Sequence, residues 1–158
     1  MSQIFKKEFS YSISQILPLA PEKTFLYFAD ETRLHDLTPD WMHFQVLSKS
    51  NPSLQNGTLI DYHLTLRRIP FHWRSQIEDW YPPGKLRVCA GQRPFRFLQT
   101  YPSVRTPAWG TLMTDRVIYR LSGGLFAEKF IQPLVQNNLD RIFSARKVII
   151  AGQFPVIP

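Results

Sequence analysis

The sequence between residues 125 and 150 repeats its apolar side chains every three or four residues, the pattern of a helix with one buried face. At about 100 degrees per residue, Asn138 falls inside this stripe, so the pattern predicts a polar amide that faces inward. A helix with one broad apolar face needs a second surface to cover it. The stripe consists of Ala127, Phe130, Ile131, Leu134, Val135, Leu139, Ile142 and Phe143.

Glycines and one proline predict the limits of this helix. Gly123 and Gly124 mark its entry, and Gly152 is the stop signal. Pro133 lacks an amide proton and clashes with the preceding turn, so we expect a late start or a kink near it. The long regular part is therefore predicted at residues 133–150.

Most of the remaining chain alternates apolar and polar residues, as the strands of a half-buried sheet do. The alternation predicts strands at residues 5–17, 44–47, 58–69, 71–78, 86–90 and 110–121, with a turn at Pro70 and two short helices between residues 20 and 37. Prolines interrupt residues 91–109, so we expect an edge strand at best, or a loop over a pocket mouth. Trp41 is expected to plug one end of the core.

The phase of the alternation assigns side chains to the inner face of the sheet. His72 and Arg74 are phased outward, with Asp61 or Glu78 as acidic partners for Arg74. Asp115 is phased inward among apolar residues, which makes it the most informative single residue. The inward set is Ile60, Tyr62, Leu64, Leu66, Phe71, Trp73, Ser75, Ile77, Met113, Asp115, Val117 and Tyr119.

Five segments in this order resemble the START-like, or SRPBCC, superfamily, in its branch of small, uncharacterised bacterial ligand-binding domains. They are PEKTFLYFAD, LTPDWMHFQVL, GTLIDYHLTLRRIPFHWRSQIEDWYPPGKL, GTLMTDRVIYRL and LDRIF, and they cover most of the chain from about Pro21 to Phe143. The resemblance, which extends to polyketide cyclases and dehydratases, implies one α+β domain over residues 1–158 with the helix-grip fold. In that fold a curved antiparallel sheet wraps around a long C-terminal helix, and two short helices follow the first strand.

The same resemblance implies an apolar cavity between sheet and helix that holds a lipid, sterol, isoprenoid, polyketide or other hydrophobic molecule. One segment departs from it. Relatives tend to carry a tryptophan and spaced histidines in the strand before GTLM, where this sequence has residues 97–102. A proton-transfer role for that strand has no candidate donor beyond Tyr101.

The cavity defines the candidate ligand-binding residues, which are Tyr62, Leu64, Trp73, Ile77, Met113, Asp115, Tyr119, Asn138 and Ile142. A buried carboxylate must be paired, hydrogen-bonded or protonated, because burial of a bare charge is too costly. Asp115 is therefore either a structural residue tied to an arginine or a backbone amide, or a ligand anchor or general base. Asn138 is either a satisfied core amide or a ligand contact. The aromatic residues either fill the core or orient one oxygen of a guest.

The composition excludes several classes of function. Cys89 is the only cysteine and the four histidines lack ligand-like spacing, so we predict no disulfide, no metal site and no cofactor. The sequence has no nucleophile elbow, phosphate-binding glycine loop or clustered basic run, which disfavours hydrolases, nucleotide-dependent enzymes and nucleic-acid binding. It also lacks a run of about 20 apolar residues and a signal-peptide core, so we expect a cytoplasmic protein.

Three functions follow from these residues. The first is binding of a small hydrophobic molecule between the sheet and the C-terminal helix. The second is a cyclase, dehydratase or isomerase that uses Asp115 with Tyr62 or Tyr119 as acid and base. The third is a peripheral lipid or quinone carrier that docks on a membrane through Arg93, Arg96 and Arg105. The net charge of +7 favours such docking on an anionic surface.

Overall fold

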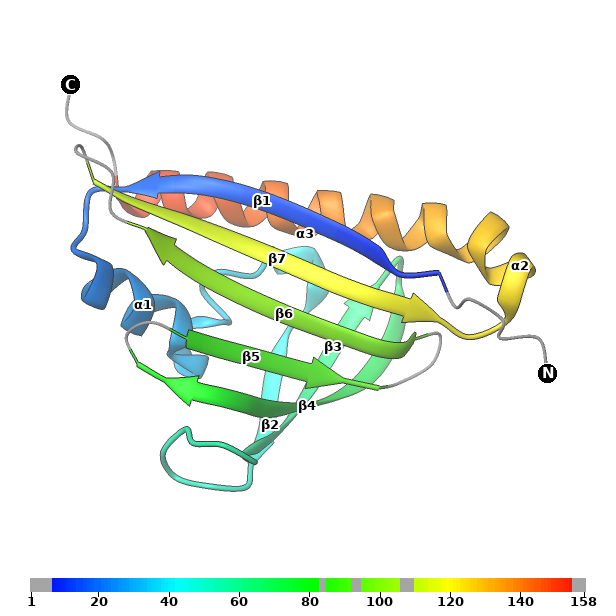
Figure 1. Cartoon of the computed structure of the whole chain (residues 1–158), viewed down its shortest axis with the longest axis horizontal. Coiled ribbons are helices and arrows are strands. Elements are labelled where there is room, and N and C mark those ends of the chain that lie inside the picture. Colours follow the sequence, from blue (N-terminus) through cyan, green and yellow to red (C-terminus); the bar gives the residue numbers. More distant parts are fainter. Residues whose placement is uncertain (1–6, 83–84, 92–94, 106–109, 155–158) are drawn as a thin grey trace.

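The computed structural model describes residues 7–82, 85–91, 95–105 and 110–154, and its main element is one curved antiparallel sheet (Figure 1). The seven strands of this sheet lie in the order β1-β7-β6-β5-β4-β3-β2, so the first strand in the chain pairs with the last. They are β1 (Phe9–Leu17), β2 (Gln45–Lys49), β3 (Leu59–Leu66), β4 (Ile69–Tyr81), β5 (Lys85–Ala90), β6 (Phe95–Arg105) and β7 (Thr111–Leu121).

The helices cover the sheet at one end and along its length (Figure 1). Helix α1 (Pro21–Ala29) follows β1, and 3-10 turns at Glu31–Arg33 and Asp40–Met42 lead to β2. After β7 come α2 (Gly124–Phe126), a π-helical turn (Ala127–Ile131) and the long α3 (Gln132–Gln153). This order confirms the predicted α+β helix-grip architecture. Within the described residues, no helix has both the length and the apolar character needed to cross a bilayer.

The predicted inner face of the sheet is confirmed most clearly on β7. Met113, Asp115, Val117 and Tyr119 are all buried, and the residues between them are half-buried or exposed. Because successive side chains of a strand point to opposite faces, the burial of Asp115 follows from its place in this alternation. The inner core beneath α3 contains Tyr11, Val117, Tyr119, Leu121, Ala127, Val135 and Phe143.

β6 is an internal strand, so the prediction of an edge strand or loop for residues 91–109 is wrong. It pairs with β7 from Phe95 to Arg105 and with β5 at residues 98–100. Pro102 stands opposite Asp115 of β7, beyond the residues that pair with β5, where a proline is tolerated as it is on an edge strand. Pro94 and Pro107 lie outside the described residues.

The hairpin between β3 and β4 turns at Arg67 and Arg68 rather than at Pro70. Pro70 is already part of β4, opposite Thr65. Both arginines have positive φ angles, 50° and 67°. A two-residue hairpin turn with positive φ at both positions matches the right-handed twist of its strands, which explains the position of the turn. Such turns normally contain Asn-Gly rather than two arginines.

The C-terminal helical segment begins before residue 133 and passes through the predicted irregularity near Pro133. In the π turn, the Gln132 N–H donates to the carbonyl oxygen of Ala127, five residues back. This wider turn accommodates a proline that lacks an amide proton and crowds the turn before it. One added residue rotates the preceding turn by about 100° relative to α3. Phe130 is therefore exposed, although the stripe predicts its burial.

Trp41 does not plug the core. Its side chain is 38% exposed, and the guanidinium of Arg141 lies 4.8 Å from the centroid of its ring. The next residue, Met42, is the one that turns inward and is buried. A 3-10 turn has three residues per turn, so neighbouring side chains diverge by about 120°.

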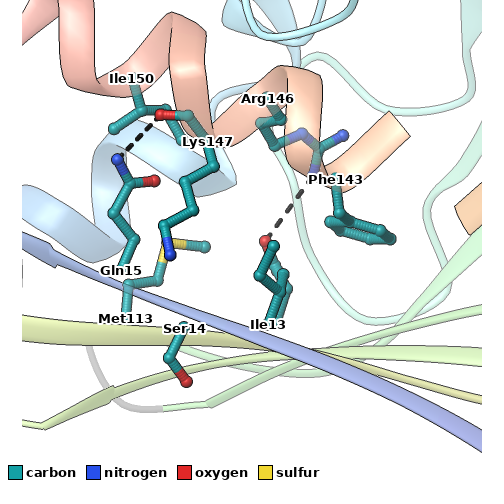
Figure 2. A pocket seen from close by; sticks show the side chains of 9 residues that line it. Ile13, Ser14, Gln15, Met113, Phe143, Arg146, Lys147 and Ile150 are labelled. Carbon is teal, nitrogen blue, oxygen red and sulfur yellow. Dashed lines mark hydrogen bonds and ion pairs between the residues drawn. The ribbon is translucent and has the colours of Figure 1, made fainter. Parts of the chain in front are cut away.

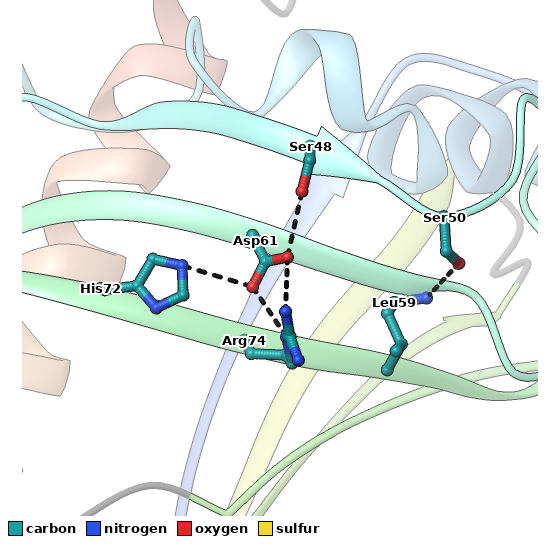
Figure 3. A network of polar contacts seen from close by, with 6 residues as sticks. All are labelled: Ser48, Ser50, Leu59, Asp61, His72 and Arg74. Carbon is teal, nitrogen blue, oxygen red and sulfur yellow. Dashed lines mark hydrogen bonds and ion pairs between the residues drawn. The ribbon is translucent and has the colours of Figure 1, made fainter.

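The outer face of the sheet holds a polar network around Asp61 (Figure 3). Arg74 donates from Nε to Asp61 Oδ1 at 2.8 Å and from Nη2 to Oδ2 at 3.1 Å. Ser48 Oγ donates to Oδ2 at 3.0 Å, and His72 Nε2 lies 3.3 Å from Oδ1. The predicted outward phase of His72 and Arg74, and the predicted pairing of Arg74 with Asp61, are confirmed.

Candidate ligand cavities

An apolar cavity lies between the β3–β4 hairpin and the N-terminal half of α3, and we call it the hairpin cavity. Its volume is about 300 Å³. Its polar side chains are the Trp73 indole and, at one end, Arg67 and Asn138, where Arg67 Nε donates to Asn138 Oδ1 at 3.3 Å. The lining residues are Met42, Leu64, Leu66, Arg67, Ile69, Phe71, Trp73, Phe95, Leu98, Ile131, Leu134, Val135, Asn138, Leu139 and Ile142.

The second cavity lies beneath α1 and the C-terminal half of α3, and we call it the α1 cavity. Its volume is about 200 Å³. It is more polar than the hairpin cavity, because Tyr62, Thr100, Asp115 and Arg146 contribute to its wall. The other lining residues are Phe28, Ala29, Leu34, Leu37, Leu54, Ile60, Ile77, Leu86, Val88 and Phe143.

The two cavities are neighbours along the same strands. On β3, Tyr62 lines the α1 cavity and Leu64 lines the hairpin cavity; on β6, Thr100 and Leu98 divide in the same way. Inward residues of a strand that are two positions apart are separated by only about 7 Å. The single gap that the sequence predicts is therefore present as two adjoining compartments, apolar at the hairpin and polar near Asp115.

Asp115 is the buried acid at the polar end of this interior. Its side chain is 10% exposed, and its Oδ2 lies 3.8 Å from Nη1 of Arg146 on α3. Burial raises the pKa of the Asp115 carboxyl above its ordinary value, and the charge of Arg146 opposes this rise only in part. Arg146 Nε is buried and has no hydrogen-bond partner among the described residues. A buried carboxylate held this loosely has capacity for a further hydrogen bond.

A narrow crevice of about 20 Å³ borders Asp115 on the side of β1 (Figure 2). Arg146 reaches from α3 toward the sheet, beside Phe143 and Ile13, and Gln15 Nε2 donates to the carbonyl oxygen of Lys147 at 3.0 Å. A space of this size accepts about one water molecule, so it is too small for an organic ligand. The crevice lies between β1, β7 and α3.

The structure distributes the predicted ligand-binding residues over these spaces. Leu64, Trp73, Asn138 and Ile142 line the hairpin cavity, whereas Tyr62, Ile77 and Asp115 line the α1 cavity. Met113 lines only the crevice.

Tyr119 lies outside all of these spaces. It is fully buried, its hydroxyl lies 3.3 Å from Gln132 Nε2 and 3.5 Å from Gln136 Oε1, and Phe9 stacks against its ring. Tyr62, not Tyr119, therefore shares a cavity with Asp115.

Sequence reasoning missed several lining residues. Phe95, Leu98 and Thr100 were missed because residues 91–109 were not interpreted as an inner strand. Arg146 carried a detectable signal, since it follows Ile142 by four residues and so lies on the same face of the helix.

Comparison with known proteins identifies the fold through structure rather than through sequence. Neither a protein-family model nor a curated protein sequence matches this chain. The structure of major latex-like protein 151 from Panax ginseng matches with a TM-score of 0.71 at 9% identity, over 94% of this chain and 99% of that one. Ara h 8.0201 matches with a TM-score of 0.59 at 14% identity, over 92% of this chain and 99% of that one.

The di-domain ARO/CYC protein BexL from the BE-7585A biosynthetic pathway is a third structural match. Its TM-score is 0.72 at 10% identity, over 96% of this chain and 51% of BexL, so this chain spans about half of that protein. These three proteins have the START-like helix-grip architecture that the sequence resembles. At such low identity the likeness establishes the fold, and this chain has the START-like helix-grip fold.

Proposed function

We propose that this protein binds a small hydrophobic molecule, of a lipid, isoprenoid or polyketide-like kind, between its sheet and α3. The observation that carries the proposal is the hairpin cavity, whose volume of about 300 Å³ is lined almost entirely by apolar side chains. Ligand pockets in proteins begin at about this size and have the same character, with a few polar groups that fix the orientation of the guest. Arg67 and Asn138 supply such groups at one end.

Burial of apolar surface supplies the binding energy. At about 25 cal/mol per Å², a guest that removes roughly 300 Å² of apolar surface from water gains about 7.5 kcal/mol, before the cost of its immobilisation. A longer guest reaches the adjoining α1 cavity, where Tyr62, Thr100, Asp115 and Arg146 can bind an oxygen. This arrangement favours an amphipathic guest over a pure hydrocarbon. We also propose that residues 1–158 form one domain that works in the cytoplasm.

The proposal is tested with the neutral dye N-phenylnaphthylamine, whose fluorescence rises in apolar surroundings. Ile142→Trp places a larger side chain at the wall of the hairpin cavity and is expected to abolish dye binding. Val148→Trp is the matched control, because Val148 lies on the same helix but is 73% exposed, and it should bind as the wild type does. Equal dye binding by Ile142→Trp and the wild type would exclude the hairpin cavity.

A second candidate function is acid–base catalysis of the cyclase, dehydratase or isomerase type. It is favoured by one observation: Asp115, whose pKa is raised by burial, shares the α1 cavity with Tyr62. A carboxyl with a raised pKa is suited to proton transfer near neutral pH. Asp115→Asn should then abolish turnover of an identified substrate while its binding is retained. Loss of binding in step with turnover would instead support a role as ligand anchor.

A further inference from the structure

We propose that the mouth of the hairpin cavity is a docking surface for an anionic lipid bilayer, through which the protein takes up or releases its guest. The uptake step rests on the proposed ligand binding, whereas the docking itself does not. The surface combines an exposed apolar ridge on the C-terminal helical segment with cations of the β3–β4 hairpin. The exposure of the ridge and the exposure of the hairpin cations are separate observations.

The apolar ridge begins at α2 and continues through the π turn. The side chains of Leu125, Phe126 and Phe130 are 83%, 65% and 53% exposed, and the rings of the two phenylalanines are 5.0 Å apart. Leu134, one turn further along, is also exposed and is part of the cavity wall. The ridge therefore leads directly to the hairpin cavity. A segment with large exposed apolar side chains can bury them in the boundary between headgroups and acyl chains.

Cations flank this ridge and the mouth of the cavity. Arg67 and Arg68 form the exposed tip of the β3–β4 hairpin, and Arg67 also lines the cavity. On the ridge, the amino group of Lys129 lies 5.5 Å from the centroid of the Phe130 ring. The neighbouring carboxylate, Glu128, is half-buried. Each exposed cation near an anionic membrane surface strengthens binding about fivefold.

The turn at Arg67 and Arg68 gives a second reason to assign a function to the hairpin tip. Both residues have a left-handed backbone, at φ of 50° and 67°, where Asn-Gly is the favoured pair. Two arginines in such positions cost stability, and strained residues of this kind cluster at functional surfaces. The tip therefore carries two cations at positions where the backbone favours other residues.

A second copy of the chain is a less suitable occupant for this surface than a bilayer. In a symmetric dimer the same patch faces itself, so Arg67, Arg68 and Lys129 of one copy would approach the same cations of the other. Like charges brought together across an interface are unfavourable. Anionic lipid headgroups complement these cations, and the acyl chains accept the phenylalanine rings.

This surface differs from the contact that the sequence suggests. Arg93 lies outside the described residues, and the side chains of Arg96 and Arg105 are not described either. The side chains of the ridge, of the hairpin tip and of the cavity wall are all among those that the structure describes. They provide both of the interactions that stable membrane attachment requires, apolar insertion and electrostatic attraction.

The test is sedimentation with phosphatidylcholine vesicles that either contain or lack phosphatidylglycerol. The wild type should bind the anionic vesicles more tightly, and binding should weaken as salt screens the charges. Phe126→Ser with Phe130→Ser should weaken binding at least tenfold, whereas Val148→Ser on the exposed face of α3 should leave it unchanged. Arg67→Asn with Arg68→Gly should weaken binding by roughly fivefold for each cation, while the turn keeps residues that its backbone favours.

Three results would overturn the docking surface. They are equal binding to both vesicle types at every salt concentration, wild-type binding by the double serine variant, and a dimer in solution that this variant dissociates. The serine variant should still bind N-phenylnaphthylamine, because neither phenylalanine lines the cavity. Vesicle binding without dye binding would refute the proposed ligand and leave the docking surface intact. Dye binding without vesicle binding would refute the docking surface and leave the proposed ligand binding intact.

Discussion

Asp61 and Asp115 expose almost the same fraction of their surface, 9% and 8%, on opposite faces of the same sheet, but they are bound in different ways. Asp61 on the outer face receives two hydrogen bonds from Arg74 and one from Ser48 (Figure 3). Asp115 on the inner face has Arg146 at 3.8 Å and faces a cavity. The exposed fraction by itself therefore does not distinguish a structural carboxylate from a candidate functional one, whereas the hydrogen bonds to the carboxylate do.

The pKa values of the two carboxyls move in opposite directions because different interactions dominate at each. Hydrogen bonds from Arg74 hold the pKa of Asp61 below its ordinary value, and burial without such bonds raises the pKa of Asp115. Asp61 is thus satisfied within the protein. The Asp115 carboxyl can still accept a proton or a further hydrogen bond, and a ligand in the α1 cavity can supply the donor.

The largest expected effect comes from removal of the Phe143 ring, which lines the same two spaces as Asp115. Phe143 is buried, lines both the crevice and the α1 cavity, and stacks on Tyr11 with 5.5 Å between ring centroids. Phe143→Ala should lower the free energy of unfolding by about 3–5 kcal/mol, measured by urea denaturation. It should also admit water to Asp115 and so lower the pKa of its carboxyl.

The matched control is Phe126→Ala, because Phe126 is mostly exposed and should change stability by less than about 0.5 kcal/mol. Similar losses for the two variants would mean that Phe143 does not pack as the structure shows.

Asparagine variants of the two aspartates should change stability in opposite directions. Asp61→Asn removes the charge that Arg74 binds through Nε and Nη2, so it should lower the free energy of unfolding at neutral pH. Asp115→Asn removes a carboxylate whose charge the folded state disfavours, so it should raise the free energy of unfolding at neutral pH. Urea denaturation of both variants measures the two signs, and losses in both would show that Asp115 is as firmly bound as Asp61.

The pH dependence of stability sharpens the same contrast. For Asp61, with a lowered folded pKa, the stabilising contribution is present above the unfolded pKa of about 3.9 and is lost as the pH falls through the folded pKa. For Asp115, with a raised folded pKa, the contribution is greatest below about pH 3.9 and is lost as the pH rises through the folded pKa. NMR titration of the side-chain carboxyls should place Asp61 below and Asp115 above the ordinary value. The reverse order would contradict the structure.

The smallest expected effect concerns Trp41 at the surface. Trp41→Ala should lower the free energy of unfolding by about 0.5–1 kcal/mol, because it removes an exposed contact with Arg141 rather than a plug of the core. Urea denaturation checks this value, and a loss near that of Phe143→Ala would restore the interpretation of Trp41 as a core residue.

The strand phases could be predicted from the sequence because each half-buried strand repeats its pattern every two residues. The pattern on residues 111–121 is sufficient to place Asp115 inward and Arg116 outward, as the structure confirms. The five segments that resemble START-like proteins, taken in their order along the chain, then predicted the arrangement of sheet and helix. The outward network of Asp61 and Arg74 followed from the same phases.

Other features depend on tertiary contacts that the pattern does not encode. Residues 95–105 form an internal strand because β5 and β7 accept them on both sides, although Pro102 argues locally against it. The π turn changes the phase of the helix before Pro133, so the exposure of Phe130 did not follow from a regular period. The division of the interior into two cavities depends on side-chain volumes on several strands at once.

The most direct test of the proposed ligand binding is a crystal structure of the protein grown with decanol, a guest with one apolar chain and one hydroxyl. We expect electron density for the chain between Leu64 and Trp73 of the sheet and Leu139 of α3, with the hydroxyl at a polar end of the interior. A structure in which these side chains close on one another and leave no space for the chain would contradict the account.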